Sequence, residues 1–111
     1  MARLNYVELP VRGIEAAKAF YEQTFGWSMT EFGPTYAATT SGDTDIGLQA
    51  DGREATKAPL PVIEVEDLEA AQAAVEQAGG RIVRAAFAFP GGRRFHFLDP
   101  SGNELAAVKS G

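Results

Sequence analysis

Apolar and polar residues alternate along the first segment of the chain, from Leu4 to Val11. One face of this segment carries Val7, Leu9 and Val11, and the other carries Tyr6, Glu8 and Pro10. A period of two is typical of a strand that buries one face. We therefore expect a strand here, with Tyr6 and Glu8 on the face opposite to the one that packs against a helix.

Two further segments, residues 14–26 and 68–80, have nearly the same sequence. Seven of their thirteen positions are identical at a constant offset of 54 residues. Their apolar spacing predicts two helices, the first ending at Gly26 and the second beginning after Asp67 and ending at Gly79 and Gly80. The residues of the first helix expected to face a sheet are Ile14, Ala17, Phe20 or Tyr21, and Phe25. A repeat of this length indicates two copies of one supersecondary unit.

Short β-type segments separated by turn-forming residues complete both copies. The expected strands of the first copy, after the one at its start, are residues 28–32, 36–40 and 44–49, and those of the second are 60–66, 81–89, 93–98 and 104–109. The sequence thus predicts an α+β fold of two tandem βαβββ modules. We expect one domain over residues 1–111, with module one at 1–50, a polar connector at 51–59 and module two at 60–111.

The net charge, the lack of cysteine and the lack of long apolar runs exclude several kinds of partner and site. The 111 residues carry a net charge of −5, which argues against nucleic acid and anionic membranes as partners, because both need a basic surface. The chain has no cysteine, which excludes disulfides and zinc–thiolate sites. No apolar run approaches the length of a membrane span or of a signal peptide core, so we expect a cytoplasmic protein.

Two motifs resemble those of a known family. Residues 20–27 read Phe-Tyr-x-x-x-Phe-Gly-Trp, and residues 95–105 read Phe-x-Phe-Leu-Asp-Pro-Ser-Gly-Asn-Glu-Leu. Together with the tandem modules they resemble the vicinal oxygen chelate superfamily, which includes glyoxalase I, extradiol dioxygenases and bleomycin resistance proteins. The resemblance implies curved sheets around a cavity with the helices outside. It also implies a homodimer, since such proteins usually build their cavities across a two-fold interface.

In metal-dependent members of that superfamily, side chains from the first and last strand of each module hold a divalent ion. The matching positions of this chain are Tyr6, Gly47, Leu60 and Ala106. Three of them have no donor atom in the side chain, and a neutral tyrosine is a poor ligand for the ions expected. We therefore expect no metal and no other cofactor. An alignment slipped by two residues would offer an unusual carboxylate site made of Glu8, Asp45 or Glu104.

Two residues are candidates for acid–base chemistry. His96, the only histidine, could act as a general base, or it could simply line the cavity or the sheet surface. Glu8 on the first strand could transfer protons or anchor a ligand, whereas Glu64 fits a solvated strand end. The residues expected to bind a ligand are Tyr6, Glu8, Trp27, Tyr36, Gly47, Leu60, Arg94, His96 and Ala106.

These features predict a metal-free small-molecule-binding protein of the glyoxalase and bleomycin resistance type. Its ligand would be planar and largely apolar, neutral or cationic, and held in the cavity between the sheets with Glu8 as polar anchor. The alternative is a glyoxalase-like lyase, isomerase or dioxygenase, with displaced metal ligands or with acid–base catalysis by Glu8 or His96. A third possibility is a structural partner whose aromatic side chains fill its own cavity.

Overall fold

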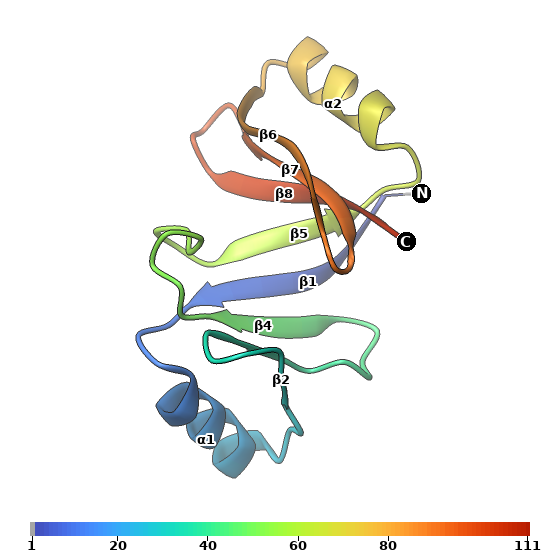
Figure 1. Cartoon of the computed structure of the whole chain (residues 1–111). Helices are drawn as coiled ribbons and strands as arrows, with labels where there is room; N and C mark the ends of the chain where they lie inside the picture. Colours follow the sequence, from blue (N-terminus) through green and yellow to red (C-terminus); the bar gives the residue numbers. More distant parts are fainter. Residues whose placement is uncertain (1) are drawn as a thin grey trace. The chain divides into compact units, whose positions relative to one another are not determined.

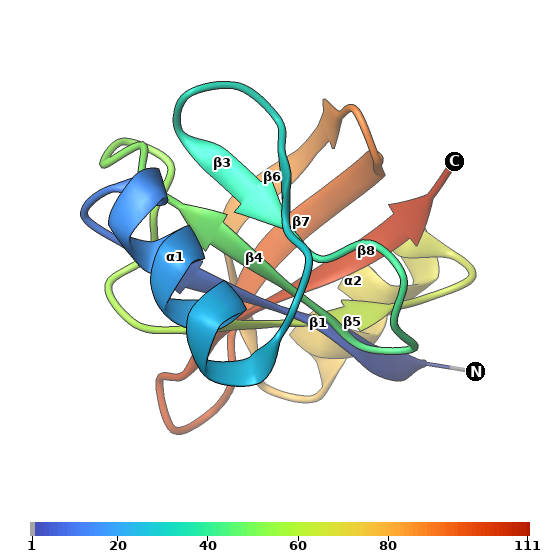
Figure 2. The same cartoon turned by 90° about the horizontal axis from the view of Figure 1, so that it is seen from below.

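The computed structural model describes residues 2–111, which form two compact units. One unit comprises Tyr6–Leu60, and the other comprises Pro61–Gly111 together with residues 2–5. Each has the element order β-α-β-β-β, with the helix on one side of its strands (Figures 1 and 2). The α+β class predicted from the sequence is confirmed. None of the helices within residues 2–111 is both long and apolar enough to cross a membrane.

The first unit contains β1 (Arg3–Pro10) from Tyr6 onward, α1 (Ile14–Phe25), β2 (Thr30–Glu31), β3 (Tyr36–Ala38) and β4 (Asp45–Gln49), in the strand order β2-β3-β4-β1. β1 runs parallel to β4, and the other neighbours are antiparallel. The core under α1 is made of Ile14, Met29, Ala37 and Leu48, with Leu9, Val11, Ala17, Tyr21, Ile46 and Ala50 packed around it. Since side chains alternate along a strand, the intervening residues of β1 and β4 lie on the opposite face.

The end of α1 differs in part from the prediction. Gly26 does cap the helix in the left-handed conformation, with φ 72°, and its N–H bonds to the Glu22 carbonyl at 2.9 Å. The expectation that Phe25 faces the sheet was wrong, because this residue is 58% exposed. Phe25 is the last residue of α1, and its ring stacks on Tyr21 and Trp27 instead of entering the core. Of the pair Phe20 or Tyr21, it is Tyr21 that packs inward.

The second unit contains β5 (Leu60–Glu64) from Pro61 onward, α2 (Leu68–Gln77), β6 (Arg81–Phe89), β7 (Gly92–Leu98) and β8 (Glu104–Ser110), in the strand order β5-β8-β7-β6. Its core joins Leu68 of α2 to Phe95 and Ala107, with Val65, Ala71, Val75, Ile82, Ala86 and Phe97 around it. Asp67 caps α2 by accepting a hydrogen bond from the Ala70 N–H at 3.0 Å. Because Phe95 and Phe97 face α2, Arg94 and His96 face the other way.

Strand β6 carries two irregularities that change which side chains share a face. Its pairing with β7 shifts register between Ile82 and Arg84 and again between Arg84 and Phe87. A bulge inserts an extra residue and re-aims the side chains that follow it. Arg84 therefore lies opposite His96, and Phe87 lies opposite Arg94, on the face away from α2.

Candidate functional site

Three polar side chains of the first unit meet on the face of its sheet that α1 does not cover. Tyr6 and Glu8 come from β1, and Tyr36 comes from the start of β3. The Tyr36 hydroxyl donates a hydrogen bond to Glu8 Oε1 at 3.1 Å and lies 2.5 Å from the Tyr6 hydroxyl. We call Tyr6, Glu8 and Tyr36 the tyrosine–glutamate cluster.

Gly47 of β4 makes room for this cluster. It pairs with Glu8 across the parallel ladder and with Ala38 across the antiparallel one. A Cβ at position 47 would collide with the hydroxyls of Tyr6 and Tyr36 and would lie 2.8 Å from Tyr6 Cζ. The absence of a side chain at Gly47 is therefore what allows the two hydroxyls to lie over the strand.

Tyr36 holds its proton firmly. Burial, followed by the neighbouring Glu8 carboxylate and Tyr6, raises the pKa of Tyr36 well above its usual range. Glu8 is only 3% exposed, so its carboxylate lies in a largely desolvated environment beside a phenol that stays neutral. Such a carboxylate attracts a hydrogen-bond donor or a positive charge strongly, because water screens it little.

The residues at the positions expected to hold a metal do not fit one. In the first unit the space above Gly47 is taken by the hydroxyls of Tyr6 and Tyr36. Leu60 and Ala106 are fully buried and have no donor atom in the side chain. Within residues 2–111 there is no group of three or more His, Cys, Asp or Glu side chains placed to hold a metal ion.

The carboxylates of the slipped alignment already have other partners. Asp45 accepts hydrogen bonds from the Thr39 hydroxyl at 2.8 Å and from the Gly42 N–H at 3.0 Å, so it stabilises the turn before β4. Glu104 Oε2 lies 2.8 Å from His96 Nδ1. Glu64, which was not part of that alignment, accepts a hydrogen bond from the Ser110 hydroxyl at 3.0 Å near the end of its strand.

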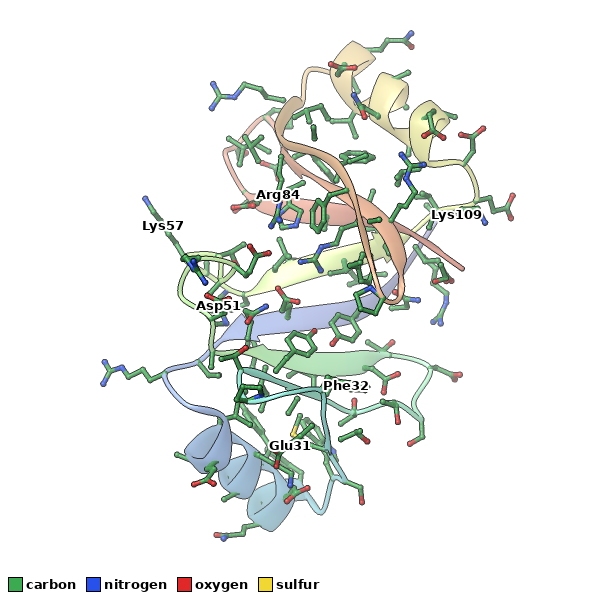
Figure 3. The ribbon with its side chains drawn as sticks, viewed as in Figure 1. Glu31, Phe32, Asp51, Lys57, Arg84 and Lys109 are labelled. Carbon is green, nitrogen blue, oxygen red and sulfur yellow. The ribbon has the colours of Figure 1, made fainter. Side chains whose placement is uncertain are left out.

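A second group of side chains lies on the face of the other unit that α2 does not cover. It consists of Arg84 and Phe87 of β6 with Arg94 and His96 of β7, and we call it the histidine–arginine face. The Arg84 guanidinium carbon lies 3.7 Å from the centre of the Phe87 ring, and that of Arg94 lies 5.3 Å from it. The His96 and Phe87 rings are 6.0 Å apart. Figure 3 shows Arg84 on the side of β6 that points away from α2.

His96 is held in one orientation by Glu104 of β8. Burial lowers the pKa of His96, the hydrogen bond to Glu104 raises it, and the positive charge of Arg94 lowers it again, with a net decrease. The imidazole is therefore neutral at neutral pH. A neutral ring whose Nδ1–H donates to a carboxylate leaves Nε2 as a hydrogen-bond acceptor.

The structure brings together some of the residues predicted to bind a ligand and separates others. Tyr6, Glu8, Tyr36 and Gly47 meet in one unit, and Arg94 and His96 meet in the other. Trp27 lies apart from the tyrosine–glutamate cluster, because its ring stacks on Tyr21 at 5.6 Å on the side of α1. Ala106 pairs with His96 across the β7–β8 ladder.

Sequence reasoning missed Arg84. Strict alternation along β6 would place Ile82 and Arg84 on the same face, and Ile82 packs in the core under α2. The first bulge breaks that alternation and turns Arg84 to the other face. No signal in the local sequence marks this bulge, since the segment contains neither glycine nor proline.

Comparisons with known proteins agree with this fold. A family model described as Glyoxalase/Bleomycin resistance protein/Dioxygenase superfamily matches residues 3–107. No curated protein has a sequence significantly similar to this chain.

Several solved structures share the fold at low sequence identity. A hypothetical protein from Bacillus halodurans superposes with a TM-score of 0.82 at 13% identity, covering 99% of this chain and 95% of its own. Methylmalonyl-CoA epimerase from Mycobacterium tuberculosis gives 0.78 at 18% identity, covering 97% and 87%. The Mn(II)-bound glyoxalase from Novosphingobium aromaticivorans gives 0.71 at 22% identity, covering 98% of this chain but 40% of that longer protein.

Proposed function

The chain belongs to the Glyoxalase/Bleomycin resistance protein/Dioxygenase superfamily, and we propose that within it this protein binds a small molecule without a metal ion. The observation that carries the proposal is the filling of the space above Gly47 by two tyrosine hydroxyls. A carboxylate or imidazole ligand at position 47 would need a Cβ where those hydroxyls lie. The site is built around a hydrogen-bonded cluster in place of a ligand set.

Glu8 is the polar anchor of the proposed ligand. One of its oxygens is held by the Tyr36 hydroxyl, which fixes the carboxylate on the sheet surface. A planar, largely apolar molecule that is cationic or carries an N–H donor suits this carboxylate together with the flat faces of Tyr6 and Tyr36. Ring stacking adds about 0.5–1.5 kcal/mol for each aromatic pair beyond the area that is buried.

Metal independence can be tested by thermal unfolding. We expect the chelator-treated protein to keep its melting temperature when nickel, zinc, manganese or ferrous iron is added. An ion present at a hundredfold its dissociation constant would stabilise the fold by about 2.7 kcal/mol, which corresponds to a shift of several degrees. A shift of that size with any one ion would contradict the proposal.

The anchor can be tested separately by calorimetric titration with planar cations and planar carboxylates. We expect cations to bind, and Glu8→Gln to weaken their binding about tenfold or more, because the variant keeps the shape of the side chain and removes its charge. Glu31→Gln is the matched control, since Glu31 of β2 pairs with Lys18 at the surface beside α1 (Figure 3). Cation binding that survives Glu8→Gln unchanged would show that the anchor lies elsewhere.

A further inference from the structure

The imidazole of His96 has one nitrogen with a partner and one without. Nδ1 lies 2.8 Å from Glu104 Oε2. Nε2 is buried and has no hydrogen-bond partner among residues 2–111, although His96 as a whole is only 2% exposed. Buried polar atoms in native proteins are nearly always satisfied by protein or water, so this nitrogen can accept a hydrogen bond from a donor outside these residues.

Glu104 fixes the tautomer of His96 and therefore determines which ring nitrogen can accept a hydrogen bond. A carboxylate only accepts hydrogen bonds, so Nδ1 carries the proton and Nε2 presents a lone pair. Burial and the guanidinium groups of Arg94 and Arg84 lower the pKa of His96 despite the opposing effect of Glu104, which keeps that lone pair available at neutral pH. The matching group is therefore an O–H or N–H donor.

Two arginines lie near His96 in a chain whose net charge is −5. Arg84 lies directly opposite His96 on β6, and Arg94 is two residues away on β7. Both guanidinium groups lie over aromatic rings, at 3.7 Å for Arg84 on Phe87 and 5.4 Å for Arg94 on Phe89. A guanidinium stacked on a ring directs its N–H donors sideways, which is the geometry that binds a carboxylate in a bidentate manner.

Arg93, the neighbour of Arg94, provides a contrast on the same strand. Its guanidinium pairs with Glu69 of α2 at 3.1 Å, so it lies on the helix-covered side. The two adjacent arginines of β7 thus serve opposite faces. Of these two neighbours, only Arg94 lies on the face that carries His96.

We propose that the histidine–arginine face binds an aromatic hydroxy acid, with its carboxylate held by Arg84 and Arg94 and its hydroxyl donating a hydrogen bond to His96 Nε2. Phe87 supplies a flat apolar surface between these groups. This site is built without any residue of the tyrosine–glutamate cluster, so it goes beyond the proposed function and does not depend on Glu8 as an anchor.

The single histidine allows a direct test by nuclear magnetic resonance. In protein labelled with ¹⁵N-histidine and carrying no histidine tag, the imidazole signals come from His96 alone. The probes are mandelate and 4-hydroxybenzoate, each compared with its analogue without the hydroxyl, phenylacetate and benzoate, and with its neutral amide. We expect at least one hydroxy acid to shift the Nε2 resonance in the manner of an accepted hydrogen bond, with no such shift from its deoxy analogue and much weaker binding of its amide.

Substitutions identify the groups that bind. We expect Arg94→Gln to weaken the binding of the active acid about tenfold or more and Arg94→Lys to weaken it less, whereas Arg93→Gln leaves it unchanged. Glu104→Gln should release the fixed tautomer and abolish the Nε2 response. Unchanged backbone spectra in the variants show that the fold is intact.

Three results would overturn the proposal. The first is that none of the acids perturbs His96 at millimolar concentration. The second is that amides bind as well as acids, or that Arg93→Gln weakens binding as much as Arg94→Gln. The third is that the free protein carries its imidazole proton on Nε2, because the lone pair on which the proposal depends would then be absent.

Discussion

At the scale of single residues, the tyrosine–glutamate cluster depends on the lack of a side chain at Gly47, and the histidine–arginine face depends on a ring nitrogen of His96 that is unpaired among the described residues. Because Gly47 has no side chain, the hydroxyls of Tyr6 and Tyr36 fit above it, and because His96 Nε2 has no hydrogen-bond partner within residues 2–111, it can act as an acceptor. The roles of Gly47 and His96 both follow from their neighbours on adjacent strands.

Gly47→Ala should destabilise the protein by about 1–3 kcal/mol, because a Cβ forces the two tyrosine rings out of place in a packed site. Urea unfolding measures the change. Gly52→Ala is the control, since a Cβ there meets nothing within 4 Å. Combining Gly47→Ala with Tyr36→Phe should recover part of the loss, and strictly additive effects would show that the collision with the Tyr36 hydroxyl is unimportant.

Tyr36→Phe should reduce the free energy of unfolding by about 1–3 kcal/mol at neutral pH, because the buried Glu8 carboxylate loses a donor. The pH dependence should also change. The raised pKa of Tyr36 means that the folded state keeps a proton that the unfolded state releases near pH 10, so this contribution to stability is present below about pH 10 and is lost as the pH rises further.

Unfolding measured between about pH 8 and 11 should therefore show a steeper decline for the wild type than for Tyr36→Phe. Tyr21→Phe, which removes a hydroxyl from the helix-covered side, should keep the wild-type steepness. Equal slopes in all three proteins would contradict the assignment of the alkaline decline to Tyr36.

At the scale of elements, the two helices are similar in sequence but begin differently. α2 starts at Asp67, whose side chain caps the Ala70 N–H, whereas α1 starts at Gly13, which makes no side-chain cap. Their apolar faces are what hold both helices on their strands. The caps adjust the stability of each helix without changing its position.

Asp67→Ala should destabilise the second unit by about 0.5–2 kcal/mol through the loss of its N-cap. Gly13→Asp should stabilise α1 by a few tenths of a kcal/mol, because Gly13 is extended and a Cβ there meets nothing within 4 Å. Chemical denaturation followed by circular dichroism measures both changes. Effects of the same sign would contradict this view of the two helix starts.

At the scale of the whole molecule, the chain displays a group of exposed aromatic rings on α1 and just after it. Phe20 and Phe25 are exposed, and Trp27 is partly so. Exposed apolar groups of this kind often mark a surface that a partner covers. Two modules of about 55 residues each also bury only a modest share of their surface alone.

We propose that the protein is a homodimer, the arrangement that the resemblance to its family implies. Light scattering at micromolar concentration should give twice the chain mass of 11.8 kDa. Phe25→Glu should lower that mass toward the monomer if the rings of α1 lie in the contact. A monomer across the whole concentration range would remove the dimer proposal.

Local pattern was sufficient for the type and order of the elements and for the two faces of β1. The alternation in β1, the repeat of residues 14–26 at 68–80 and the caps at Gly26 and Asp67 predicted the α+β fold, because burial periodicity and capping depend on residues a few positions apart. The same alternation placed Tyr6 and Glu8 on the face away from the helix. Position matching also identified Gly47, although it could not show what fills the space above it.

Only the tertiary structure decided which of these side chains meet. Tyr36 reaches Glu8 across a separation of 28 residues, and Arg84 reaches the face of His96 only because a bulge in β6 reverses the alternation. Trp27 turned out to lie with Tyr21 and Phe25 on the side of α1, apart from the tyrosine–glutamate cluster. Strand order, register and bulges arise from long-range pairing and packing, which leave no local mark in a single sequence.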